Sequence, residues 1–206
     1  MALNITYILL AFTVTTSLFI RSRKLILCAT IITITSALLH GIINLESLLA
    51  ILSLFGLSYT YFSYGNLSRL LKTILFLIII LLISGFLIHI IPGFANSLVI
   101  DKERLSPLSC PFSMYLNFDK TIAAVVLVMA SGLFVRQANP FGMKTLRNTV
   151  LISALCIAVL IPLAILSGYV QFDPKFPDVF WFWAFNNLYF VCFAEEVIFR
   201  GMIQSH

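Results

Sequence analysis

The chain has 206 residues, of which 61% are hydrophobic and only 10% are charged. A mean hydropathy of +1.06 excludes an ordinary water-soluble domain and is typical of a protein embedded in a lipid bilayer. The formal net charge is +5, but the basic residues are not interleaved with aromatic ones as in a nucleic-acid groove. We therefore expect membrane lipid as a partner and no nucleic acid.

Seven apolar stretches, separated by polar breaks, come close to the length of about 20 residues that a helix needs to cross a bilayer. They lie at residues 3–20, 25–43, 47–64, 73–92, 120–135, 149–170 and 179–203. The third stretch, which is rich in small polar residues, and the short fifth stretch are the least typical. The chain lacks the alternating ten-residue segments of an outer-membrane barrel. The sequence therefore predicts an all-α, polytopic transmembrane helical bundle with about seven spans.

The longest break between these stretches predicts how the chain is organised. We interpret residues 93–119 as an outer loop, with a short interfacial helix at about residues 112–118. This loop separates four N-terminal spans in residues 1–92 from three further spans in residues 120–206. The chain is therefore expected to form a single membrane domain over residues 1–206.

Basic residues are distributed unevenly between alternate connections. Those after the first, third and fifth stretches carry eight basic residues and no acidic one: Arg21, Arg23, Lys24, Arg69, Lys72, Arg136, Lys144 and Arg147. The opposite connections carry more acidic than basic residues. Because cytoplasmic loops accumulate Lys and Arg, the first set is expected in the cytoplasm and the N-terminus outside. The N-terminus lacks the basic region of a signal peptide, so the first stretch is expected to remain as a span.

Three ionisable residues, Glu195, Glu196 and Arg200, fall close together near the end of the last apolar stretch. At 1.5 Å per residue, Glu195 lies about 24 Å along a helix from Val179, toward the cytoplasmic face. Glu196 and Arg200 have the i,i+4 spacing, with the acid first, that favours an ion pair. Such a pair leaves Glu195 uncompensated, and a desolvated carboxylate near a cation can act as a general base. A buried salt bridge that joins helices is the structural alternative.

Residues 194–201, with the sequence AEEVIFRG, resemble the EExxxR motif and its FRG ending in the CAAX protease and bacteriocin-processing (CPBP) family. That family is similar to the type II CAAX prenyl endopeptidases. Over residues 1–190 only the hydrophobic layout is similar. The resemblance implies a bacterial inner-membrane endopeptidase that hydrolyses a peptide bond in a membrane-associated protein or peptide. It further implies that Glu195 activates the attacking water, while Glu196 and Arg200 complete the motif and Arg200 holds the carboxylates.

The same resemblance implies an FxxxH motif and then an HxxxN or HxxxD motif after the EExxxR residues, and neither follows Arg200 in this sequence. A divalent metal such as zinc is implied as well, without a complete ligand set here. His206 would lie about 16 Å beyond Glu195 on a straight helix, too far to share a metal ion. His40 and His89 fall near the outer face, where hydrogen bonds between helices are expected. We therefore expect a truncated protease that is inactive alone, and that is either poorly stable or assembles with another chain that supplies the missing helices.

Two other functions remain open on the sequence. The polar face around Glu195 could belong to a non-catalytic membrane module that binds a peptide or protein partner. A small ion-coupled transporter would use Glu195 and Glu196 as a cation site. It is less favoured, because the chain has no repeated half.

The topology can be tested at residues 22 and 106 in a chain without its native cysteines. Ser106→Cys should react with a membrane-impermeant thiol reagent in intact cells, because the 93–119 loop is expected outside. Ser22→Cys should react only after the membrane has been permeabilised. Strong labelling at position 22 with none at position 106 would show the opposite orientation.

Overall fold

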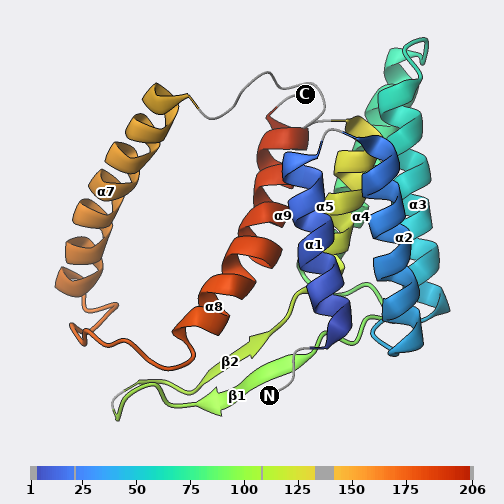
Figure 1. Ribbon diagram of the computed structural model, residues 1–206. Coiled ribbons are helices and arrows are strands. Elements are labelled where there is room, and N and C mark those ends of the chain that lie inside the picture. Colours follow the sequence, from blue (N-terminus) through green and yellow to red (C-terminus); the bar gives the residue numbers. More distant parts are fainter. Residues whose placement is uncertain (1–3, 21, 108, 133–141, 205–206) are drawn as a thin grey trace. The chain divides into compact units, whose positions relative to one another are not determined.

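The computed structural model describes residues 4–20, 22–107, 109–132 and 142–204 (Figure 1). The protein is mostly helical (69%) and divides into two compact units. The larger unit comprises Met1–Val135 and Val179–His206, and the smaller one comprises Arg136–Asp178.

Five helices and a hairpin form the first part of the larger unit. The helices are α1 (Ile5–Phe19), α2 (Arg23–Leu39), α3 (Leu45–Ser63), α4 (Arg69–Leu87) and α5 (Phe118–Ser131), and the strands β1 (Leu98–Glu103) and β2 (Phe112–Tyr115) lie between α4 and α5. The last helical stretch follows as four consecutive segments, of which two are π-helical: α8 (Phe180–Asn186), η1 (Asn187–Cys192), α9 (Phe193–Glu196) and η2 (Val197–Ile203).

Three helices in the described part of the chain are long and apolar enough to cross a membrane, namely α3, α4 and α7 (Met143–Leu166). This finding is consistent with a membrane protein, but it does not support the predicted seven spans. Helices α1, α2 and α5 have 15, 17 and 14 residues, fewer than the roughly 20 needed. The last apolar stretch is interrupted by π-helical segments. In the smaller unit, α7 contains Pro162 and has no buried residue.

The connection between α4 and α5 contains a β-hairpin, so the interfacial helix predicted at residues 112–118 is wrong. Strands β1 and β2 are antiparallel, with Ile100 opposite Met114. In β2 the half-buried Phe112 and the buried Met114 alternate with the exposed Ser113 and Tyr115. This two-residue period suits a strand that covers apolar neighbours on one side.

Helix α5 is the central helix of the larger unit (Figure 1) and contacts α1, α2, α3, α4 and α9. All of its residues are buried except Lys120 and Met129, which are half-buried. Its middle turns consist of alanine, valine and other compact apolar residues, which allow neighbouring helices to approach closely. The helix therefore has apolar neighbours on every side.

Hydroxyl groups join α1 to α2. The Oγ1 atoms of Thr13 and Thr33 lie 2.8 Å apart, and Thr6 Oγ1 lies 2.8 Å from Ser36 Oγ. Interhelical hydrogen bonds of this type are common between membrane helices. His40 Nδ1 lies 3.4 Å from Thr6 Oγ1, so the predicted contact of His40 between helices is confirmed.

Gly93 follows α4 and packs against the start of α3. Asn44 caps α3 by accepting a hydrogen bond from the backbone N–H of Ser47, and its own N–H donates to the Gly93 carbonyl at 3.0 Å. Gly93 has φ +84°, and a Cβ atom at this position would collide with the Asn44 side chain. Only glycine meets both requirements without strain.

Replacing Gly93 with alanine should lower the free energy of unfolding by at least about 1 kcal/mol, because an L-residue is strained at positive φ and its methyl group would displace the cap of α3. Thermal unfolding in detergent measures the loss. Gly56→Ala is the control: Gly56 lies within α3 with no atom near its Cβ position, so alanine should raise stability by about 0.5–1 kcal/mol. Equal effects of the two variants would contradict this account of Gly93.

Candidate functional site

The EExxxR residues lie on the last helical stretch, with Glu195 and Glu196 in α9 and Arg200 in η2. The predicted ion pair is present, because Arg200 Nε lies 3.0 Å from Glu196 Oε2. The pair is not a buried salt bridge that joins helices, since both partners lie on one helical stretch and the side chains of Arg200 and Glu196 are 73% and 55% exposed. The neighbouring Phe193 and Ala194 are buried, and α9 contacts α5. Because α9 packs on α5 through its apolar side, the charged residues face away from the bundle.

Glu195 is also exposed, and its side chain makes no ion pair or hydrogen bond with the described residues. The i,i+4 pair next to it therefore leaves Glu195 as the uncompensated carboxylate, as the spacing predicts. No group of three or more His, Cys, Asp or Glu side chains in the described part of the chain could hold a metal ion. These residues do not fit the implied zinc, so we derive no step through a metal. His206 lies outside the described residues.

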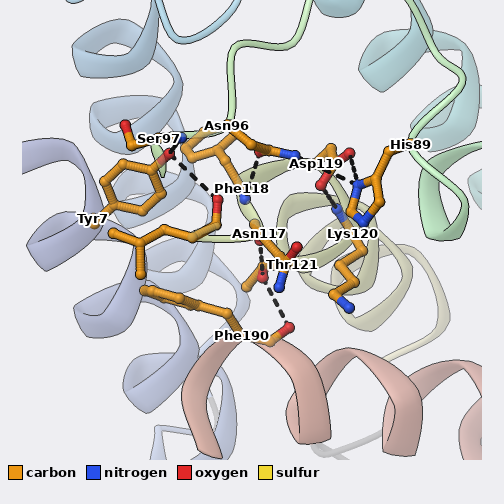
Figure 2. Close-up of polar contacts among 11 residues, drawn as sticks. Tyr7, His89, Asn96, Ser97, Asn117, Phe118, Asp119, Lys120, Thr121 and Phe190 are labelled. Atoms are coloured by element: carbon orange, nitrogen blue, oxygen red, sulfur yellow. Dashed lines mark hydrogen bonds and ion pairs between the residues drawn. The ribbon is translucent and has the colours of Figure 1, made fainter. Parts of the chain in front are cut away.

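A second polar cluster, which sequence reasoning missed, lies where α4, the hairpin and α5 meet (Figure 2). His89 Nδ1 lies 2.6 Å from Asp119 Oδ2, and the side chains are 41% and 2% exposed, respectively. In the tautomer with its proton on Nδ1, the imidazole donates to the carboxylate and keeps Nε2 as an acceptor. A buried carboxylate thus orients a half-exposed imidazole.

The end of α4 positions His89. The N–H of Ile90 donates to the Gly85 carbonyl, and the N–H of His89 donates to the Phe86 carbonyl. This is the Schellman pattern, which usually has glycine in the left-handed position. Here His89 occupies that position with φ 59°, at a cost of about 1–2 kcal/mol for an L-residue.

The start of α5 positions Asp119. Asp119 lies in the first turn, and its Oδ1 accepts a hydrogen bond from the N–H of Lys120 at 2.8 Å. A negative charge is stabilised at a helix N-terminus by the helix dipole. Nearby, Asn96 Oδ1 accepts from the N–H of Phe118 at 3.0 Å, and Asn96 Nδ2 lies 3.4 Å from His89 Nδ1. The asparagine therefore ties the loop after α4 to the start of α5.

Three further hydrogen bonds attach neighbouring elements to this region (Figure 2). The Tyr7 hydroxyl of α1 accepts from the N–H of Ser97 at 2.9 Å and lies 3.4 Å from the Leu116 carbonyl oxygen. Thr121 of α5 donates to the carbonyl of Phe190 in η1 at 3.0 Å. These bonds connect the site to α1 at the start of the larger unit and to η1 in its last helical stretch.

A cavity of about 610 Å³ opens beside this cluster, and we call it the His89–Asp119 cavity. Its walls come from the loop after α4, from β2, from the start of α5 and from α8–η1, and they include His89, Asn96, Tyr115, Asp119, Trp183 and Asn186. Asn186 is 3% exposed, and its Oδ1 accepts no hydrogen bond from the described residues. Asn187 and Val191, which precede Glu195 at four-residue steps, also line the cavity.

His89 and Asp119 are separated by 30 residues, and no motif spacing connects them. The sequence did indicate a hydrogen bond between helices for His89, and its contact with α5 confirms that expectation. Asp119 was counted only among the charges of the outer connections. The useful signal is an acid in the first turn of an apolar helix, where the helix dipole stabilises its negative charge.

Comparisons with models of protein families, with curated proteins and with solved structures found no match to this chain. Its function is therefore argued from the two groups of residues described above.

Replacing Asp119 with alanine should lower the free energy of unfolding by about 1–3 kcal/mol, because it leaves hydrogen-bond donors without their partner. Thermal unfolding in detergent again measures the change. Asp173→Ala is the control, since Asp173 pairs with Lys175 through partly exposed side chains and such pairs contribute about 0–1 kcal/mol. If Asp119→Ala costs no more than Asp173→Ala, the pair with His89 does not stabilise the start of α5.

Proposed function

We propose that this chain takes part in an intramembrane endopeptidase of CAAX-protease type, with Glu195 as the general base. The observation that carries the proposal is the ion pair between Glu196 and Arg200, which leaves the adjacent Glu195 free to exchange a proton. The substrate is a peptide bond in a membrane-associated protein or peptide.

In this reaction Glu195 takes a proton from a water molecule, and the oxygen of that water forms a bond to the scissile carbonyl carbon. The tetrahedral intermediate then collapses, the C–N bond breaks, and Glu195 returns the proton to the leaving amine. Arg200 forms an ion pair with Glu196 and so compensates the negative charge next to Glu195. A general base supplies about 10²–10⁴-fold of rate, so groups that stabilise the oxyanion must complete the site.

We further propose that the protein resides in the inner membrane of a bacterium with its N-terminus outside. The three helices that could span a membrane and the uneven distribution of basic residues support this placement. Glu195 then lies toward the cytoplasmic face, from which the substrate would enter.

A non-catalytic module that binds a peptide or protein partner is the second candidate. The exposure of Glu195, Glu196 and Arg200 favours it, because an exposed charged face on a membrane helix needs a polar partner. Under this alternative the carboxylates would bind basic groups of the partner, and no bond would be broken.

The two candidates predict different behaviour of Glu195→Gln. In membranes of the source organism, where any partner chain is present, this variant should lower cleavage of a peptide substrate by about 10²–10⁴-fold. Both prenylated and unprenylated peptides should be assayed. The purified chain alone should show no cleavage, because the FxxxH motif implied by the resemblance is not in its sequence.

Glu46→Gln is the matched control, since it makes the same change at an exposed glutamate in the first turn of α3. It should leave cleavage unchanged. If Glu195→Gln cleaves as well as the unmodified chain, the endopeptidase proposal is wrong. If Glu195→Gln leaves cleavage unchanged but weakens binding of the peptide, the non-catalytic module is favoured.

A further inference from the structure

We propose that the His89–Asp119 cavity is a binding site for a small organic ammonium ion, separate from the EExxxR residues. Its volume of about 610 Å³ falls within the roughly 300–1,000 Å³ that is typical of small-molecule sites. Like most such sites, it has apolar and aromatic side chains in its walls together with some polar ones.

The charge of the walls favours a cation. Asp119 is the one acidic residue among the described residues that line the cavity, and no lysine or arginine is among them. Lys120 donates its backbone N–H to Asp119 Oδ1 but does not line the cavity. The carboxylate of Asp119 therefore has no lysine or arginine beside it in the walls. An anionic ligand would be repelled by this carboxylate.

The polar atoms also favour a ligand with N–H groups. Asn186 Oδ1 is buried and accepts no hydrogen bond from the described residues, which is costly for a buried acceptor. His89 Nε2 is a second acceptor in the tautomer that donates to Asp119. An ammonium group offers several N–H donors around one positive charge, which suits walls that contain hydrogen-bond acceptors.

Aromatic side chains complete the site. Trp183 and Tyr115 line the cavity together with Phe94 and Phe112. Aromatic faces attract cations, and tryptophan does so most strongly. They also provide an apolar surface for the body of an amine. The expected ligand is thus an ammonium group attached to a hydrophobic or aromatic body.

The backbone of His89 supports a role beyond stability. His89 is held at φ 59°, where glycine would relieve the strain. Strained residues of this kind concentrate at functional sites. In this conformation the imidazole contacts Asp119 and lines the cavity, which a glycine could not do.

The test uses the full chain, purified in detergent, with benzylammonium as the probe and the tryptophan fluorescence as the signal. Trp183 lines the cavity, so we expect a saturable change on titration with benzylammonium. Benzoate, which reverses the charge, should give none, and benzyl alcohol should show how much of the signal comes from partition into detergent. Absence of saturable binding by benzylammonium, or equal binding of benzoate, would overturn the proposal.

Asn186→Leu distinguishes a ligand-binding role from a structural one. It should weaken benzylammonium binding by about 10–100-fold, because a hydrogen bond from a charged donor is lost, without lowering the midpoint of thermal unfolding. Ser58→Ala is the matched control: Ser58 Oγ is also buried without a hydrogen-bond partner, but it lies in α3 away from the cavity. Ser58→Ala should bind benzylammonium as tightly as the unmodified chain. The proposal would be contradicted if Asn186→Leu did so as well.

If Asn186→Leu does not fold, Asp119→Asn decides the question. The amide keeps the shape of the carboxylate but removes its charge, so affinity for benzylammonium should fall by at least about tenfold. Binding of benzyl alcohol should not change. An Asp119→Asn variant that binds benzylammonium as tightly as the unmodified chain would overturn the proposal.

Discussion

The burial of α5 is the constraint on which the rest of the larger unit depends. A helix that is apolar on every side must be surrounded by other helices, and α5 contacts α1, α2, α3, α4 and α9. Its first turn nevertheless carries a carboxylate, that of Asp119. A buried carboxylate requires hydrogen-bond donors, and the structure supplies His89 and the N–H of Lys120.

Both groups of candidate residues take their positions from this helix. The His89–Asp119 cavity opens beside the N-terminal end of α5, and the loop after α4 is fixed there by Asn96. Farther along, α9 packs on α5 with Phe193 and Ala194 buried. This packing leaves Glu195 on the exposed side. A change in the packing of α5 would therefore alter the cavity and the EExxxR face together.

The last helical stretch connects the two groups. Asn187 and Val191 line the cavity, and Glu195 follows one turn beyond Val191. The hydrogen bond from Thr121 of α5 reaches the carbonyl of Phe190, which lies in η1, one of the π-helical segments. π-Helical turns occur frequently at functional sites, and here they lie on both sides of α9.

The sequence by itself determined the local features. Apolar stretches became helices, although only α3, α4 and α7 meet the length and hydropathy of a membrane span. The Glu196–Arg200 pair could be predicted because both partners lie on one helix, four residues apart. The alternation in β2 is equally local, but it is only four residues long, too short for its period to distinguish a strand from a helix.

Only the tertiary structure decided which side chains meet across the bundle. His89 and Asp119 are 30 residues apart, and their contact depends on the angle at which the chain leaves α4 and on the packing of α5 between its neighbours. The exposure of Arg200 and the burial of Asn186 follow from the same packing. The spacing of residues along a helix fixes which of them share a face, whereas the partner of that face is set by contacts between distant segments.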